Sequence, residues 1–151
     1  MTDPRRTLDL ALKTIFYFFL QRVFAELEGE PLKSLEYVDA LSLALQQATE
    51  KDAGRLLVTI PPRHLKSVAA AIALPAWLLG RDPAAKVMIA TYSDTLSAEH
   101  AEKFSRIVNA PWYKRLFTNT RAASSNKYEW RTTAGGARYG VSLGGTVTGF
   151  G

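Results

Sequence analysis

A lysine followed by a serine, Lys66 and Ser67, stands between two apolar segments of the chain. The stretch "LLVTIPPRHLKSVAAAIALPAWLLG", residues 56–80, runs from an apolar segment through two prolines and a basic cluster into a second apolar segment. This order predicts a strand, a tight loop and a helix that begins at Lys66 and Ser67. The layout is typical of a phosphate-binding loop, in which backbone N–H groups and a helix N-terminus face an anion. Lys66 would contact the β- and γ-phosphates, and the Ser67 hydroxyl would bind Mg²⁺.

The match to the ordinary Gly-x-x-x-x-Gly-Lys-Ser pattern is incomplete, because Ile60 and Leu65 stand where its glycines would be. The alternative is a proline-punctuated turn between a strand and a helix, in which Arg63 and Lys66 are only solvated. Judged by this pattern alone, the turn is the favoured interpretation.

Other residues with reactive side chains give weaker signals. His64 and His100 are too isolated to predict a metal site, and the chain has no cysteine. The segment "PWYKRLF", residues 111–117, interleaves aromatic residues with Lys114 and Arg115 and could contact a DNA backbone. A short helix that buries its aromatic side chains and leaves its cations in water is the favoured interpretation.

Hydrophobic spacing predicts helices first and then alternating strands and helices, which favours an α/β sheet. Asp3 followed by Pro4 is an ordinary helix start. The predicted elements are, in order, one amphipathic helix at 8–29, a helix from 35 to a stop at Gly54, a buried strand at 55–60, a helix at 66–79, a buried strand at 86–92, a helix at 94–108 capped by Ser93 or Asp94, and antiparallel hairpins after Phe117.

Composition is that of a globular domain or part of one, since 47% of the 151 residues are hydrophobic and 22% are charged. A net charge of +5 suits an anionic partner such as DNA or a nucleotide. Lys13 and Arg22 interrupt the most apolar helix, so its uncharged run is far shorter than the roughly 20 residues that a membrane span needs. We expect no transmembrane segment and no secretory signal.

Several blocks, taken together, resemble one protein family. "IPPRHLKS" is similar to the deviant Walker A motif of large terminase subunits, the DNA-packaging ATPases of tailed bacteriophages and prophages. "LPAWLLGRDP", "VMIATYSDTLSAEHAEKFSRIV", "APWYKRLF" and "YEWRTTAGGARYGVSLGGTVTG" follow in the order of that family. The resemblance covers residues 35–151. The helical start is less specific.

The resemblance implies an incomplete RecA-like P-loop NTPase, a three-layer αβα fold with N-terminal helices and a C-terminal β-hairpin region. It implies an N-terminal helical segment at 1–54 and a partial P-loop ATPase domain at 55–151 that stops before the Walker B strand. In the full-length protein such a domain couples ATP hydrolysis to the translocation of double-stranded DNA into the procapsid. The implied partners are double-stranded DNA, the terminase small subunit, the portal and further copies of the chain, in the host cytoplasm and without a membrane.

The resemblance also assigns residues to the ATP site. Lys66 would be the phosphate-contacting lysine, Arg63 a candidate γ-phosphate sensor and Ser67 the ligand of Mg²⁺. Tyr92 and Ser93 match the end of the second strand, where a core-edge role for Tyr92 is an equal alternative. The implied nucleotide-binding loop consists of Pro62, Arg63, His64, Leu65, Lys66, Ser67 and Val68.

The chain departs from the family at two places. Phe150 stands where the family more often has arginine, and no apolar strand ending in two acidic residues occurs in the sequence. Those carboxylates hold Mg²⁺ and activate water in the family, and phosphoryl transfer depends on such positioning. We therefore expect half of an ATP site and no hydrolysis at a motor-like rate. The alternative is a non-catalytic prophage remnant or a basic nucleic-acid-binding fragment without turnover.

Two structural expectations follow. A leucine at positive φ costs roughly 1 to 2 kcal/mol, so we expect Leu65 to keep an ordinary φ with the help of Pro61 and Pro62. In the RecA-like order the strands at 55–60 and 86–92 are not neighbours. Each would expose unpaired backbone groups, which predicts marginal stability.

Overall fold

A computed structural model describes residues 3–50, 54–61 and 65–143 of the chain. These residues form six α-helices, one π-helix and a four-stranded mixed sheet. The predicted α/β class is therefore confirmed. The chain forms two compact units, Met1–Trp77 and Leu78–Gly151, and each is described by itself. The predicted division near residue 54 stays a prediction.

The first unit contains the helices α1 (Pro4–Thr14), α2 (Phe16–Glu28) and α3 (Glu36–Glu50), the π-helix η1 (Val68–Ala73) and the first half of α4 (Leu74–Arg81). Trp77 is fully buried at its centre, where the indole ring lies 5.4 Å from the ring of Phe16 and the indole N–H donates to the Leu12 carbonyl at 3.1 Å. The buried apolar side chains around it include Phe19, Leu20, Val23, Val38, Leu41, Leu45 and Ile72.

The start of α1 is confirmed, and its predicted length is wrong. Asp3 accepts a hydrogen bond from the Arg5 N–H at 3.0 Å, as an N-cap does. The predicted single helix at 8–29 is broken at Ile15, whose backbone is extended. Gln46 of α3 accepts a hydrogen bond from the Phe16 N–H and donates one to the Thr14 carbonyl. A side chain from a distant helix therefore satisfies the backbone groups that the break releases.

The predicted strand at 55–60 is wrong. Residues 54–61 contain neither helix nor strand, and the side chain of Leu57 is 91% exposed. An apolar run forms a strand only where a neighbouring strand accepts its hydrogen bonds. In the described part of the chain no strand pairs with this run.

The helix predicted at residues 66–79 is confirmed, and its first part is a π-helix. Residues 66–81 are helical throughout, and η1 replaces α-helical hydrogen bonding between Val68 and Ala73, so that the Leu74 N–H bonds to the Ala69 carbonyl. Pro75 explains the change. In an α-helix its ring would clash with the carbonyl of Ala71 and would offer that carbonyl no N–H, and a π-type turn relieves this conflict.

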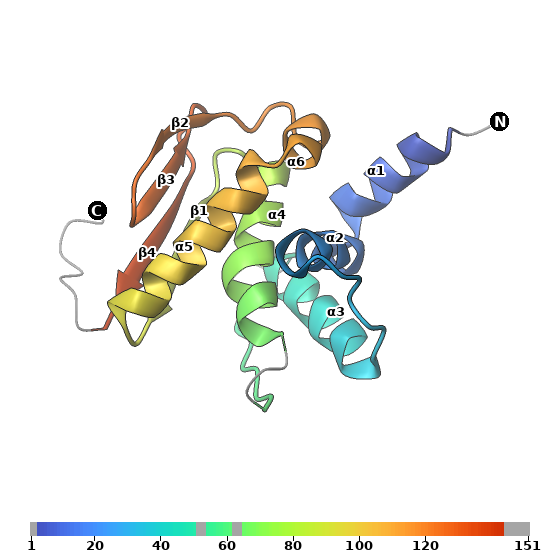
Figure 1. Ribbon diagram of the computed structural model, residues 1–151, viewed down its shortest axis with the longest axis horizontal. Coiled ribbons are helices and arrows are strands. Elements are labelled where there is room, and N and C mark those ends of the chain that lie inside the picture. Colours follow the sequence, from blue (N-terminus) through green and yellow to red (C-terminus); the bar gives the residue numbers. More distant parts are fainter. Residues whose placement is uncertain (1–2, 51–53, 62–64, 144–151) are drawn as a thin grey trace. The chain divides into compact units, whose positions relative to one another are not determined.

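The second unit contains the end of α4 and the elements β1 (Lys86–Thr91), α5 (Asp94–Asn109), α6 (Pro111–Leu116), β2 (Ala122–Ser125), β3 (Glu129–Thr132) and β4 (Ala137–Ser142). The sheet order is β1-β4-β3-β2, with β1 parallel to β4 and the other pairs antiparallel. Figure 1 shows α5 running along this sheet. The predictions of a strand near 86–92, a helix at 94–108 and C-terminal hairpins are confirmed.

Burial of β1 on both faces was predicted and is wrong. Its side chains alternate in exposure, and Met88 is 48% exposed. The strand pairs only with β4 among the described strands, so one edge and one face are uncovered. Such an edge is where a further strand can add.

The helices α5 and α6 supply most of the core of the second unit. Ser93 caps α5 by accepting a hydrogen bond from the Leu96 N–H at 3.2 Å. Phe104 of α5 meets Trp130 of β3 edge to face, with ring centres 5.5 Å apart. In α6 the side chains of Trp112, Tyr113 and Leu116 are buried while Lys114 and Arg115 are exposed. The favoured interpretation of "PWYKRLF", a helix with buried aromatics and solvated cations, is confirmed.

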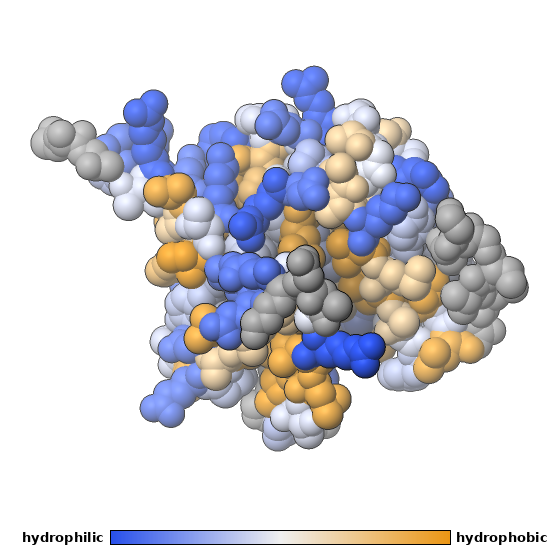
Figure 2. Space-filling view, turned by 180° about the vertical axis from the view of Figure 1, so that it is seen from behind, coloured by the Kyte–Doolittle hydropathy of each residue, from blue (hydrophilic) through white to orange (hydrophobic). Residues whose placement is uncertain are grey.

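The surface carries apolar side chains as well as charged ones. Figure 2 shows one face on which hydrophobic and hydrophilic residues are interspersed. Large apolar side chains that are at least 40% exposed include Leu8, Leu10, Leu43, Leu57, Met88 and Leu143. Within residues 3–50, 54–61 and 65–143, no helix has the length and apolar character needed to cross a bilayer.

Candidate nucleotide-binding site

The backbone of Leu65 differs from the ordinary φ expected from the sequence. Its φ is +66°. Among the described residues other than glycine, Leu65 alone has a positive φ. The expectation of an ordinary φ is therefore wrong. A left-handed leucine costs roughly 1 to 2 kcal/mol, so the surrounding structure must hold it there. The ordinary phosphate-binding pattern places glycine at this position, where positive φ carries no such cost.

Lys66 and Ser67 open the helix directly after Leu65. The Ala69 N–H donates to the Leu65 carbonyl at 2.9 Å, which starts the helical turn. Both Lys66 and Ser67 are exposed, and the Ser67 hydroxyl makes no capping hydrogen bond. The first N–H groups of a helix have no partner within the helix. An ammonium group, a hydroxyl and backbone donors thus belong to consecutive exposed residues at a helix N-terminus, where the helix dipole and the N–H groups favour an anion.

Val68, the last predicted loop residue, begins η1. A π-type turn one residue after the Lys-Ser pair is a local departure from the α-helix, and such turns are frequent at functional sites. Pro75 was visible in the sequence as a possible cause. Pro62, Arg63 and His64, which complete the predicted site, lie outside the described residues.

The residues predicted at the end of the second strand have separate roles in the second unit. The Tyr92 side chain is 77% exposed, which does not fit the alternative of a core-edge aromatic residue. Ser93 uses its hydroxyl to cap α5. Next to them, the Thr91 hydroxyl donates to the Ser93 carbonyl at 2.9 Å. The end of β1 is therefore shaped by local hydrogen bonds around one exposed aromatic ring.

The histidines give no metal site in the described part of the chain. His100 is buried on α5, and no cluster of three or more His, Asp or Glu side chains forms among the residues described. Burial is the main cause that lowers the pKa of His100, and the positive charge of Arg138 lowers it further. His100 is therefore a neutral core residue at neutral pH.

Arg138 is a residue that the sequence analysis missed. It lies on β4, is 1% exposed, and its Nε and Nη2 atoms have no hydrogen-bond partner in the described structure. Its guanidinium carbon lies 5.2 Å from the ring centre of Phe104. Because side chains of a strand point to its two faces in turn, the sequence could have suggested that Arg138 points inward. Only the packing of α5 onto β4 reveals that no carboxylate accompanies it.

We compared the chain with known proteins. No protein-family model, no curated protein and no solved structure matches it.

Proposed function

We propose that this chain is the ATP-binding, N-terminal portion of a viral DNA-packaging motor ATPase of the terminase large-subunit type. The loop at residues 62–68 would hold the phosphates of ATP, with Lys66 on the β- and γ-phosphates and Ser67 on Mg²⁺. In the full-length protein this site would couple ATP hydrolysis to the movement of double-stranded DNA into a procapsid. Arg63 would sense the γ-phosphate.

The conformation of Leu65 is the observation that carries this proposal. A leucine with positive φ stands immediately before an exposed lysine and serine at the start of a helix, and a simple turn between two elements does not require this costly conformation. The conformation has a reason in a phosphate-binding loop, because a residue in the left-handed conformation turns successive backbone N–H groups toward one point. The same loop sequence, "IPPRHLKS", carries the family resemblance.

The sheet of the second unit supports the finer proposal of a RecA-like fold in one respect. β1 is followed by α5 and lies parallel to β4 after a long connection, as strands do in sheets built from strand-helix-strand units. We also propose the three-layer arrangement and a strand before the phosphate-binding loop that lies within the sheet.

One observation favours the alternative function, a fragment without turnover. Residues 54–61, which would form the strand before the loop, are not in the sheet, and Leu57 is almost fully exposed. The sequence also offers no apolar strand ending in two carboxylates. The proposed activity of this chain is therefore nucleotide binding without motor-like hydrolysis.

Titration of the chain with a fluorescent ATP analogue in Mg²⁺ tests the proposal. We expect saturable binding that Lys66→Ala weakens at least about tenfold, since a charged donor to phosphate contributes about 1.5 to 3 kcal/mol. Ser67→Ala should weaken binding chiefly when Mg²⁺ is present. Lys114→Ala removes an equally exposed lysine of α6 and should have no effect.

The same samples test turnover by phosphate release. Equal loss of binding in Lys66→Ala and Lys114→Ala would show only general attraction of an anion to a basic protein, and the nucleotide site would be refuted. Rapid phosphate release that disappears in Lys66→Ala would refute the absence of hydrolysis.

A further inference from the structure

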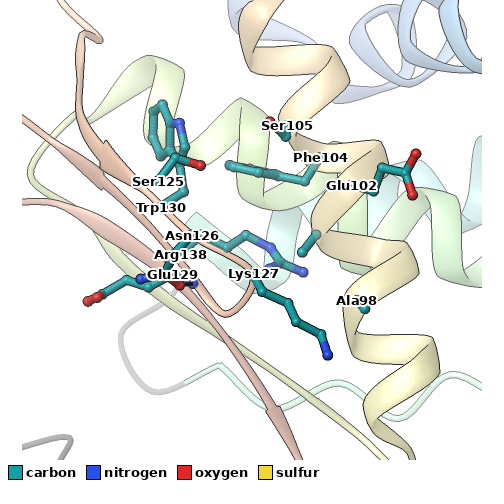
Figure 3. Close-up of a pocket in the computed structure, with 11 residues that line it drawn as sticks. Ala98, Glu102, Phe104, Ser105, Ser125, Asn126, Lys127, Glu129, Trp130 and Arg138 are labelled. Atoms are coloured by element: carbon teal, nitrogen blue, oxygen red, sulfur yellow. Dashed lines mark hydrogen bonds between the residues drawn. The ribbon is translucent and has the colours of Figure 1, made fainter.

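A pocket in the second unit is formed by α5, β4 and the turn that joins β2 to β3. Its volume is about 210 Å³. Figure 3 shows the side chains of Arg138, Phe104 and Lys127 around it, contributed by three separate segments. Ala98 and Ala101 of α5 also line the pocket.

The guanidinium of Arg138 lines this pocket and forms no ion pair with any described carboxylate. Burial lowers the pKa of Arg138 to about 10, so the group is still protonated at neutral pH. The face of Phe104 offsets part of its charge. Nε and Nη2 are left without acceptors, although a buried guanidinium normally has them.

Two polar atoms of α5 are also buried without a hydrogen-bond partner among the described residues. The Ser97 Oγ and His100 Nδ1 atoms are buried and have no partner in the described structure. A Cβ atom at Gly140 would lie 2.9 Å from Ser97 Oγ and 3.2 Å from Arg138 Nη1, so the glycine backbone packs closely against both side chains and brings them to the same place. The unpartnered polar atoms thus gather between α5 and β4.

The acidic residues around the pocket do not neutralise Arg138. Glu129 is paired with Arg131 at 2.5 Å, and Glu102 is exposed on α5. In Figure 3 the carboxylate of Glu102 is turned away from the guanidinium. Lys127, also exposed, adds a second positive charge at the rim.

We propose that this pocket binds a small oxyanion, a phosphate or carboxylate group, on the guanidinium of Arg138. Arginine has only donors, and its planar fork matches two oxygens of a carboxylate or phosphate. The volume is below the 300 to 1,000 Å³ of typical ligand pockets, so the ligand is smaller than a nucleotide. The site is separate from the proposed ATP loop and does not depend on it.

Side-chain NMR of the whole chain tests the site directly. The Nε–H resonance of Arg138 is followed during titration with inorganic phosphate and, separately, with acetate. A Lys66→Ala background prevents phosphate bound at the proposed ATP loop from contributing. We expect the Arg138 resonance to shift and saturate, while that of the exposed Arg115 stays in place. Saturation by phosphate alone or by acetate alone supports the site and identifies which oxyanion it takes.

Two variants test which groups bind the anion, and the backbone N–H resonance of Ala101, which lines the pocket, reports the affinity in each of them. Arg138→Met should weaken binding at least about tenfold, and Lys127→Met, at the exposed rim, about two- to threefold. Arg115→Met removes an equal charge from α6 and should leave the affinity unchanged. If Arg138→Met fails to fold, the Lys127→Met variant and the Arg138 resonance of the chain that keeps this arginine still test the proposal. No movement of the Arg138 resonance at about 50 mM of either anion, far above a millimolar dissociation constant, would overturn the proposal. So would unchanged affinity in a folded Arg138→Met variant.

Discussion

Leu65 holds strain that a glycine would not. Its left-handed backbone costs roughly 1 to 2 kcal/mol, and a Gly at this position would remove that cost while adding chain entropy to the unfolded state. We expect Leu65→Gly to leave the free energy of unfolding unchanged or to raise it by up to about 1 kcal/mol. Binding of the ATP analogue should be retained, because the loop keeps its shape.

Leu43 provides the matched control. It is an exposed leucine in the middle of α3, where glycine should cost about 1 kcal/mol relative to a good helix former. Urea unfolding of both variants measures the difference. If Leu65→Gly were as destabilising as Leu43→Gly, Leu65 would not be strained in solution.

His100 should make stability depend on pH. Burial and the charge of Arg138 lower its pKa in the folded chain, Lys103 adds to this, and Glu99 acts in the opposite direction. The unfolded chain therefore takes up a proton at higher pH than the folded chain does, and stability falls as the pH drops below about 6.5. Unfolding free energies between about pH 8 and pH 5.5 should show this slope. His100→Gln should flatten it, and an unchanged slope would contradict the assignment.

Gln46 connects three helices of the first unit. Its amide satisfies the Phe16 N–H at 2.9 Å and the Thr14 carbonyl at 3.2 Å, where α1 ends and α2 begins. Gln46→Ala would leave these backbone groups without their partner and should lower the free energy of unfolding by about 1 to 2 kcal/mol.

The neighbouring Gln47 is exposed on the same helix, and Gln47→Ala should change stability by less than about 0.5 kcal/mol. Urea unfolding followed by circular dichroism gives both values. Similar values for the two variants would show that water replaces Gln46 at the break without loss.

The molecule as a whole should unfold gradually. The chain forms two compact units, and among the described residues the apolar run at 54–61 pairs with no strand and β1 pairs only with β4, with Met88 48% exposed. These features predict marginal stability, a broad thermal transition and binding of a hydrophobic dye before unfolding is complete. Circular dichroism melting with dye fluorescence tests this. One sharp transition at high temperature from a soluble monomer would show that the prediction is wrong.

Elements whose signals are local could be predicted from the residues alone. The Asp3 and Ser93 caps, the helix that starts at Lys66, the strand at β1 and the hairpins after Phe117 each depend on residues a few positions apart. The sequence also indicated the Lys-Ser pair and the chemistry that such a pair performs.

Features that depend on partners far along the chain became visible only in the folded protein. Gln46 accepts a hydrogen bond from the Phe16 N–H, 30 residues away, where α2 begins, and among the described residues no strand pairs with the run at 54–61. The backbone of Leu65 is left-handed because its surroundings outweigh a local cost that residue preferences alone would avoid. Arg138 becomes an unpaired buried cation only when α5 packs on β4, since a pattern of residue types does not say which side chains will meet.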